Sequence, residues 1–383
     1  MTIRDPQIAN GTKGPASRVL LEGMLTSSNT VTVTKTVPAG TYQIDSVYPL
    51  GVTIGGTYAE AVSPSAGLLT VASTQSSITL NNRCLGVVWS DTTLPANADW
   101  YDVAYGNGVW VAIANYVANA ATSTDGINWT VRTTPSSSLA TITFGNGIFV
   151  AVGNDAAATS TDGITWTSRT IPTGNWCTVT YGNGTFVALA TSGTNAATST
   201  NGTTWTARTI PSGYQWNSVT YGNGLFVGVT WYDNSVIVSN NNGTNWTAYN
   251  PSMDSMWSIT YGNSLFVVVG DTNSNTNNVG VKTSTNGQTW TARTMPPGTW
   301  KSVVYANGTF IAISEQTYAS GAAAATSFDG ITWTKRTLPV SGNFKKMGYG
   351  NNQLVAIANT VPSLSSSTFN TPFSITKIPS TIY

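Results

Sequence analysis

Apolar and polar residues alternate along most of the chain in short runs, which are separated by glycine-containing turns. One stretch shows the pattern clearly: WCTVTYGN at 176–183, TFVALAT at 185–191, NAATSTNG at 195–202 and TWTARTIP at 204–211. Thr, Val, Trp, Tyr and Phe favour extended backbone, and strict alternation is typical of half-buried strands. Asn-Gly between two such runs favours a tight hairpin, because both central residues of a type I′ turn need positive φ. The stretch therefore predicts four antiparallel strands, here called a, b, c and d.

This four-strand pattern recurs along the chain. Copies of YGNG or close variants begin at Tyr105, Phe144, Tyr181, Tyr221, Tyr261, Tyr305 and Tyr349. Copies of STDGITWTSRTIP place a tryptophan at Trp129, Trp166, Trp205, Trp246, Trp290 and Trp333. Four strands in each unit of about 40–45 residues are the arithmetic of a β-propeller. Seven YGN copies predict seven blades, with six or eight as alternatives.

A closed ring needs a strand that completes its last blade, because an open ring leaves a strand edge exposed. Two segments qualify. Residues 366–379 contain a decayed copy of the tryptophan segment, with Phe373 in the tryptophan place. Residues 86–95 place Trp89 and Pro95 in the same register upstream of the first full copy. The sequence leaves both alternatives open.

The first 82 residues do not repeat. Residues 30–37, 41–48, 51–56 and 68–73 alternate in the manner of strands, whereas 17–25 fits either a short helix or a strand. We therefore predict an all-β protein with a small β domain over 1–82 and a seven-bladed propeller over 83–383. A small module ahead of a ring suggests an anchor that docks the chain on a larger particle.

The turn S-T-D-G-I-T-W resembles a shortened Asp-box, the turn of bacterial-neuraminidase-type repeats. The resemblance implies a propeller in which Asp125, Asp162 and Asp329 are structural turn residues, and Asn201, Asn242 and Asn286 take the same place in other units. It does not imply sialidase activity, since the box lies away from the catalytic centre in that family. Similar arrays occur in phage virion proteins. This sequence departs from the pattern by one residue between Asp and Gly.

Composition narrows the function. Of 383 residues only 8% are charged, the net charge is +1, and there is no histidine. A chain without histidine has no Ser-His-Asp triad and no histidine-ligated zinc. The low net charge argues against nucleic-acid binding, and Cys84 and Cys177 lack metal-like spacing. We expect no cofactor, no metal and no membrane insertion. The N-terminus lacks a secretory signal, so release from a host cytoplasm as part of a virion fits the composition.

The residues that an enzyme would need are spread out. Five arginines follow the unit tryptophans by three residues, so the rotation of the ring places them around the rim: Arg132, Arg169, Arg208, Arg293 and Arg336. The ring region contains a single glutamate, Glu315, whereas glycoside hydrolysis usually needs two carboxyl groups. These positions argue against a sialidase-like glycosidase.

The residues that differ between units are better candidates for a binding site. Strand order puts the b–c and d–a loops on one face, and the b–c loops vary most. The candidate ligand- or partner-binding residues there are Tyr116, Trp231, Tyr232, Asp233, Asp271, Glu315 and Tyr318. Exposed rings and amides suit sugar or protein recognition, while simple loop variation is the alternative. A second aromatic set starts strand a and either rings the channel mouth or, as we expect, packs between blades: Trp100, Trp176, Trp216, Trp257, Trp300 and Phe344.

These observations predict a non-enzymatic bacteriophage virion protein, such as a tail, fibre, neck or capsid-decorating component. Its N-terminal domain would bind other virion proteins. Its propeller would bind either a host-surface glycan or protein or another subunit of the particle, with symmetric copies adding avidity. The alternatives are a carbohydrate-binding adhesin or lectin and, with little support, a glycosidase.

Overall fold

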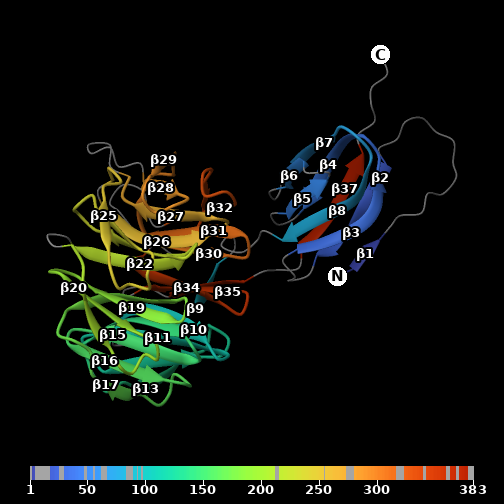
Figure 1. Ribbon diagram of the computed structural model, residues 1–383. Helices are drawn as coiled ribbons and strands as arrows, with labels where there is room; N and C mark the ends of the chain where they lie inside the picture. The colour runs from blue at the N-terminus through green and yellow to red at the C-terminus, as the bar shows by residue number, and fades with distance from the viewer. Residues whose placement is uncertain are drawn as a thin grey trace, which may run out of the picture. The chain divides into compact units, whose positions relative to one another are not determined.

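The computed structural model describes residues 2–4, 18–25, 30–46, 50–54, 57–61, 67–82, 89–92, 94–95, 98–211, 215–253, 255–272, 280–315, 323–339, 342–358, 363–367 and 371–377. The chain divides into two compact units, which Figure 1 shows as sets of strands. One unit comprises Met1–Leu85 and Ser367–Tyr383, and the other comprises Gly86–Ser366. The strand content confirms the predicted all-β class.

The first unit contains two antiparallel sheets. One has the order β1-β2-β37-β4-β7, with strands β1 (Thr2–Arg4), β2 (Arg18–Leu25), β37 (Thr371–Lys377), β4 (Gly40–Ser46) and β7 (Gly67–Val71). The other has the order β3-β8-β5-β6, with strands β3 (Thr30–Val37), β8 (Gln75–Asn82), β5 (Leu50–Ile54) and β6 (Thr57–Ala61). Residues 18–25 thus form a strand, which decides between the two alternatives for that segment.

The two sheets share one apolar core. Tyr42 and Ile44 of β4 are fully buried in the same cluster as Val52 of β5 and Leu80 of β8. Strand β3 alternates as its sequence predicts, with exposed threonines between inward-facing valines. Such alternation is what a sheet with one buried and one solvated face requires. The unit is therefore a small β-sandwich.

The second unit is a ring of seven four-stranded blades, shown in Figure 1. The inner strands are β10 (Asp99–Gly106), β14 (Leu139–Gly145), β18 (Trp176–Gly182), β22 (Trp216–Gly222), β26 (Met256–Gly262), β30 (Thr299–Ala306) and β34 (Phe344–Gly350). The second strands are β11 (Val109–Asn115), β15 (Ile148–Gly153), β19 (Thr185–Ala190), β23 (Leu225–Thr230), β27 (Leu265–Gly270), β31 (Thr309–Glu315) and β35 (Gln353–Ala358). The third strands are β12 (Asn119–Ser123), β16 (Ala156–Ser160), β20 (Asn195–Ser199), β24 (Val236–Ser239), β28 (Gly280–Ser284), β32 (Ala324–Ser327) and β36 (Ser363–Ser367). The outer strands are β13 (Thr130–Thr133), β17 (Thr167–Arg169), β21 (Thr206–Thr209), β25 (Thr247–Tyr249), β29 (Thr291–Thr294), β33 (Thr334–Arg336) and β9 (Ser90–Thr92).

The ring closes with an upstream strand. β9 pairs with β36 as the outer strand of the seventh blade, and the inner strands β34 and β10 are in contact. Thr92 on β9 donates a hydrogen bond to the carbonyl of Ile127 at 2.8 Å, which ties the last blade to the turn of the first. Residues from the two ends of the ring therefore interlock, and β9 covers the edge that β36 would otherwise expose.

The C-terminal segment corrects the expected domain boundary. The strand Thr371–Lys377, which carries the decayed tryptophan copy, pairs with β2 and β4 of the sandwich rather than completing the last blade. The propeller thus ends near Ser366 instead of running to 383. Because β9 is the outer strand of the seventh blade, the C-terminal copy is not needed there and forms part of a sandwich sheet instead.

The YGNG repeat has a packing reason. Asn183 and Gly184 both have positive φ, as a tight hairpin between β18 and β19 requires. The preceding glycine, Gly182, lies beneath the ring of Tyr221 in the next blade, and a Cβ there would be 2.1 Å from the ring. The same contact recurs in every other blade except the sixth, which has Ala306 in this place, and Gly350 of the last blade lies beneath Tyr105 of the first. The motif therefore joins neighbouring blades.

The turns between third and outer strands are held by a repeated set of hydrogen bonds. Asp162 Oδ1 accepts the backbone N–H groups of Ile164 and Thr165 at 2.8 Å, and Ser160 donates to the same carboxylate. Trp166 Nε1 donates to the carbonyl of Gly163, and each of the six repeat tryptophans makes the equivalent bond. The Asp and Trp of the motif are thus placed as turn-forming residues.

One turn differs from its expected register. In the fourth blade Asn241, not Asn242, bonds to Ser239 and accepts the N–H of Asn245. Asn242 is an additional residue with positive φ, and its side chain accepts a hydrogen bond from Asn183 in the preceding blade's hairpin. The serine-to-asparagine spacing decides which amide closes the turn, and the run of three asparagines concealed that spacing in the sequence.

Candidate binding face at the ring axis

One face of the propeller carries the starts of the inner strands together with the loops that follow the second strands. The antiparallel register places Trp100, at the start of β10, opposite Ala114, at the end of β11. The same register repeats in every blade, so the variable b–c loops and the starts of the inner strands share this face. The uniform Asn-Gly and Asp-Gly turns lie on the other face.

The aromatic residues that begin the inner strands pack between blades, with one exception. Trp100, Trp176, Trp216, Trp300 and Phe344 are at most 3% exposed. In the fifth blade Met256 takes this buried place, and Trp257 is displaced by one residue and is only half-buried. Grouping Trp257 with the other five was therefore wrong, because its register differs by one, which turns its side chain to the opposite side of the strand.

A β-bulge near the start of each inner strand creates a ring of special positions. The pairing register skips one residue per blade: Tyr101, Ala140, Cys177, Asn217, Trp257, Lys301 and Lys345. Bulges redirect side chains out of the regular alternation. Six residue types occupy this position in the seven blades, and only the sixth and seventh blades share one, a lysine. The bulge ring is thus where the repeat varies most on an otherwise uniform strand.

Five of these bulge residues line a small cavity. It has a volume of about 150 Å³ and is lined by Tyr101, Asn217, Trp257, Lys301, Lys345 and Lys346. Its walls come from the first, fourth, fifth, sixth and seventh blades. Blades on opposite sides of a ring approach each other only around its axis. The cavity therefore lies at the mouth of the central channel.

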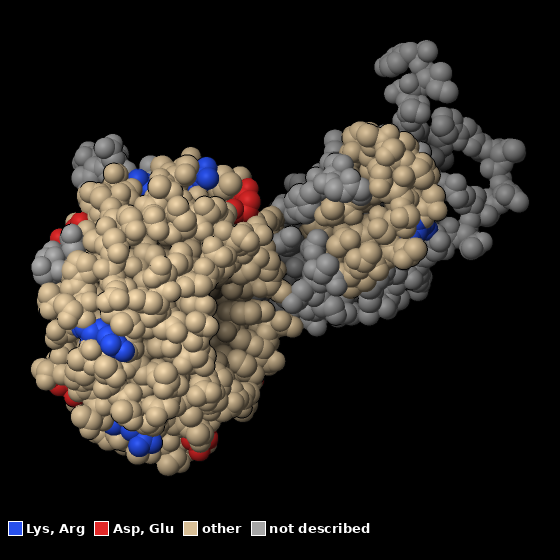
Figure 2. Space-filling view, in the orientation of Figure 1, with Lys and Arg blue, Asp and Glu red and all other residues tan. Residues whose placement is uncertain are grey.

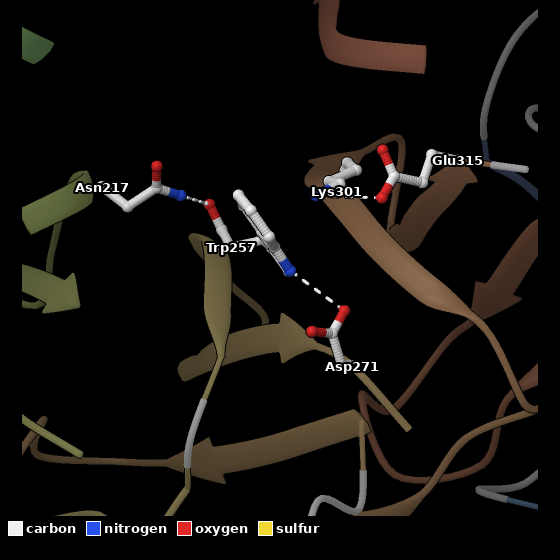
Figure 3. A network of polar contacts seen from close by, with 5 residues as sticks. All are labelled: Asn217, Trp257, Asp271, Lys301 and Glu315. Carbon is white, nitrogen blue, oxygen red and sulfur yellow. Dashed lines mark hydrogen bonds and ion pairs between the residues drawn. The ribbon is translucent and has the colours of Figure 1, made fainter. Parts of the chain in front are cut away.

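Trp257 and Lys301 are the centre of a polar network, shown in Figure 3. The ammonium group of Lys301 lies 2.9 Å from the centroid of the Trp257 ring and 3.1 Å from Oε1 of Glu315. Trp257 Nε1 donates to Oδ1 of Asp271 at 3.0 Å, and Asn217 Nδ2 donates to the carbonyl of Trp257. Two predicted site residues, Asp271 and Glu315, thus hold Trp257 and Lys301 in place.

Burial shapes the charge of this network. The side chains of Lys301 and Glu315 are 13% and 25% exposed. Desolvation lowers the pKa of Lys301, which Glu315 and Asp271 oppose and Lys345 reinforces. The ammonium group is therefore partly removed from water and partly neutralised.

Two further predicted residues extend the network toward solvent. The ring centroids of Trp231 and Trp257 are 4.6 Å apart, and those of Trp231 and Tyr232 are 4.1 Å apart. Tyr232 is 55% exposed. In the same loop, Asp233 accepts the backbone N–H of Gln215 at 2.7 Å and so fixes the loop to the start of its own blade. Trp231, Tyr232, Asp271 and Glu315 are thus joined through Trp257 and Lys301.

The remaining predicted residues lie elsewhere or are not described. Tyr116 is 79% exposed and lines a separate open cavity with Asn154 and Asn175, beside the first and second blades. Its positive φ marks a tight turn. Tyr318 and Cys84 lie outside the described residues. The predicted set is therefore one cluster and one separate site, instead of a single site.

Lys345 and Lys346 bring two more positive charges to the cavity. Both are half-buried, and neither has an ion-pair partner among the described residues. Lys346 stands where other blades have a hydroxyl or a carboxylate: Ser218, Ser258 and Ser302 each accept a backbone N–H from the following blade. An ammonium group cannot accept such a bond.

Asp102 compensates for that missing acceptor. Its Oδ1 accepts the N–H of Val103 at 2.9 Å, and its Oδ2 accepts the N–H of Ile142 at 3.0 Å and the hydroxyl of Thr141. Burial raises the pKa of Asp102, while the charge of Lys346 and these hydrogen bonds oppose the rise. Asp102 thus accepts the N–H of Val103, which Lys346 cannot accept, as well as the N–H of Ile142 in the second blade. The side chain of Lys346 lines the cavity instead.

The arginines and the cysteine have structural settings. Each repeat arginine donates from Nε to a threonine on the adjacent third strand of its own blade, as Arg132 does to Thr122 at 3.0 Å. They therefore stay on the outer strands, as expected. Cys177 donates to the carbonyl of Trp216, and desolvation raises the pKa of its thiol to about 11.

The side of the molecule drawn in Figure 2 has few charged groups. Figure 2 shows isolated basic and acidic groups on a surface that is otherwise uncharged in this view. Within the ranges that the structure describes, no group of three His, Cys, Asp or Glu residues is placed to hold a metal ion. None of the described residues belongs to a helix long and apolar enough to cross a membrane.

The loop residues of the site came from the sequence, but the strand residues did not. The binding residues predicted from departures from the repeat all belong to the predicted b–c loops. Aligning the inner strands by their buried aromatic residue reveals Tyr101, Asn217, Lys301 and Lys345 at one position. The sequence contains this alignment, but finding it requires knowing that Met256, and not Trp257, is the buried residue of the fifth blade. Only tertiary packing shows which of the two is buried.

Comparison with known proteins finds similarity only at the level of the fold. No protein-family model matches, and no curated protein sequence matches. A streptogramin B lyase structure superposes with a TM-score of 0.60 at 11% identity, covering 75% of this chain and 97% of that one. YCF48 bound to a D1 peptide has a TM-score of 0.56 at 15% identity, covering 77% and 98%. The WD40 domain of Neurospora crassa Pan2 has a TM-score of 0.52 at 10% identity, covering 78% and 97%. At such identities these likenesses support the propeller fold and nothing further.

Proposed function

We propose that this chain is a non-enzymatic binding protein in which a β-propeller presents a recognition face around its channel mouth. The single observation that carries the proposal is the contrast within the inner strands. The residue before the bulge is a large buried apolar side chain in every blade, whereas the bulge residue varies over six types in seven blades. Five of the bulge residues line one cavity, and Trp231 and Tyr232 continue from its Trp257. Residues that hold a ring together repeat, so a gathered set of non-repeating side chains favours recognition.

The chemistry of the face favours binding over turnover. Glu315 is paired with Lys301, and Asp271 accepts the indole N–H of Trp257. Neither carboxylate is placed as a free acid or base. Among the superposed propellers, the structure of a Staphylococcus aureus virginiamycin B lyase is described as inactive after a histidine-to-alanine change, and the present chain contains no histidine. The YCF48 structure, which holds a peptide, shows that a propeller of this kind can act as a binding module.

We further propose that the protein works on a bacteriophage particle, with the sandwich docked to other virion proteins and the propeller meeting a host-surface glycan or protein. The low charge, the lack of histidine and the resemblance of the repeat to virion arrays support this setting. The alternative is a carbohydrate-binding adhesin of a bacterial surface, which would use the same face.

Two measurements test the proposal. Mass spectrometry of purified particles should detect the chain, and its absence from virions would remove the proposed setting. On a glycan array, any binding should be lost in Trp231→Ala, which removes the ring that joins Tyr232 to Trp257. Ile164→Ala is the matched control, because Ile164 is an exposed apolar residue on the opposite, uniform face. Equal loss in both variants would contradict the placement of the recognition face.

A further inference from the structure

The channel mouth concentrates positive charge on a protein that has little charge elsewhere. Three of the chain's 16 basic residues, Lys301, Lys345 and Lys346, line one cavity of about 150 Å³. Lys301 and Lys345 occupy the bulges of adjacent blades and line the same cavity, and the charge of Lys345 adds to the lowering of the Lys301 pKa that desolvation mainly causes. Like charges held together in a partly buried space destabilise one another unless a counter-charge enters.

The three lysines are not equivalent. Glu315 neutralises Lys301, and the buried carboxyl of Asp102 interacts with Lys346 without an ion pair among the described residues. Lys345 has neither partner in the part of the chain that the structure describes. The lining of the cavity therefore has three ammonium groups and no carboxylate, whereas Glu315, Asp271 and Asp102 act on these lysines without lining it. A compact anion of carboxylate, sulfate or phosphate size would complement the ammonium groups in the lining.

The seam between the seventh and first blades shows that this charge has a structural cost. At the position of Lys346, three other blades use a serine that accepts a backbone N–H across the seam. Lys346 gives up that bond, and Asp102 has to supply it from the other side. A repeat protein that departs from its own stabilising residue at the ring closure has another use for the replacement.

The surroundings of the cavity suit a saccharide. Trp257 forms part of its wall, and Trp231 and the exposed ring of Tyr232 continue from it along the same face. Flat aromatic surfaces pack against the apolar faces of sugar rings, and the amide of Asn217 lines the same space. The anion and the aromatic surface would then be recognised by one ligand.

We propose that the channel mouth binds the negatively charged group of an acidic saccharide, with Lys345 and Lys346 as its ligands and the rings of Trp257, Trp231 and Tyr232 as the surface for the sugar. This inference rests on the proposed binding function and deepens it by naming the ligand class. Glu315 limits the affinity of the site for an anion, because its carboxylate is paired with Lys301 and reduces the positive charge that the anion meets.

The test uses the full chain, labelled with ¹⁵N at its 14 tryptophans, with the Trp257 indole signal assigned through Trp257→Phe. Glucuronate should shift this signal on titration, whereas glucose at the same concentration should not. Lys345→Gln should weaken glucuronate binding by about tenfold or more, the effect of losing one charge-assisted hydrogen bond. Lys335→Gln removes the same charge from an exposed site on the outer strand β33 and should bind as the parent does. Glu315→Gln should tighten binding, which a purely structural ion pair would not produce.

Three results would overturn the inference. They are an unshifted Trp257 signal with glucuronate, equal affinities of Lys345→Gln and the parent, and stronger binding of sulfate, phosphate or a glutamate-rich peptide than of glucuronate. Failure here is distinct from failure of the proposed function. Neutral-glycan binding that is lost in Trp231→Ala would support the recognition face and contradict the anion site. Glucuronate binding by a chain that is absent from virions would support the anion site and contradict the proposed virion setting.

Discussion

The two faces of this propeller are built on opposite rules. On the turn face the same residues recur: a positive-φ hairpin in all seven blades, a glycine beneath the next blade's ring in six of them, and a serine-to-Asp/Asn turn closed by a tryptophan in the first six blades. On the channel-mouth face the bulge position has six residue types in seven blades, and the neighbouring loops differ in length and composition. Repetition therefore marks the interactions that hold the ring, and departure from it marks surface that is free to recognise something.

The same contrast exists within single strands. Trp176 and Cys177 are neighbours in β18, and Met256 and Trp257 are neighbours in β26. The first residue of each pair is fully buried between blades, and the second occupies the bulge. A strand thus supports the fold with one residue and can contribute to the face with the next. Substitutions at adjacent residues should consequently have different effects.

The largest expected effect is the loss of a buried wedge. Trp176→Ala removes a fully buried ring and its hydrogen bond to Pro172, and we expect it to lower the free energy of unfolding by about 3–5 kcal/mol. Trp257→Ala removes a half-buried ring of the same size and should cost clearly less. Urea denaturation of the two variants measures the difference. Equal losses of unfolding free energy would contradict the distinction between the buried residue before the bulge and the bulge residue itself.

A smaller effect should follow from crowding a seam on the turn face. Gly182→Ala places a Cβ 2.1 Å from the ring of Tyr221, and we expect a loss of about 1–3 kcal/mol as the ring is displaced. The sixth blade provides the control, because Ala306 already stands in the equivalent place and is buried there. Ala306→Gly should change the unfolding free energy by less than Gly182→Ala does. If Gly182→Ala were neutral in thermal denaturation, the glycine would not be required by this contact.

The smallest effect concerns acid stability. The N–H groups of Thr165 and Ile164 hold the pKa of Asp162 below its ordinary value of 3.8. A carboxyl whose pKa is lower in the folded state stabilises the fold above its unfolded pKa, and this contribution is lost as the pH falls through the folded pKa. Asp162→Asn should therefore be nearly neutral at pH 7, since Asn201 and Asn286 make the same bonds in other blades. Below about pH 4 the parent should lose stability more steeply than the variant. Parallel pH profiles of the two proteins would contradict this role for the carboxylate.

Much of the architecture was predictable because the repeat is local. Four strands, two hairpin types and the blade count all depend on residues within one unit of the next, and each hairpin states its own turn chemistry. The outer-rim position of the arginines followed for the same reason. Two points failed where a local signal was ambiguous. The three asparagines at 240–242 concealed which amide closes the fourth turn, and the tryptophan at 257 looked like the others until Met256 was seen in the buried place.

The sequence by itself determined the blades, since their alternation, turns and period are written in each unit. Only the tertiary structure decided how the ring closes and where the binding face gathers. The choice of β9 over residues 366–379 depends on which chain end completes which sheet, and the sandwich competes for one of them. The meeting of Tyr101, Trp257, Lys301 and Lys345 depends on closure as well, because residues more than two hundred positions apart become neighbours only when the first and last blades are joined.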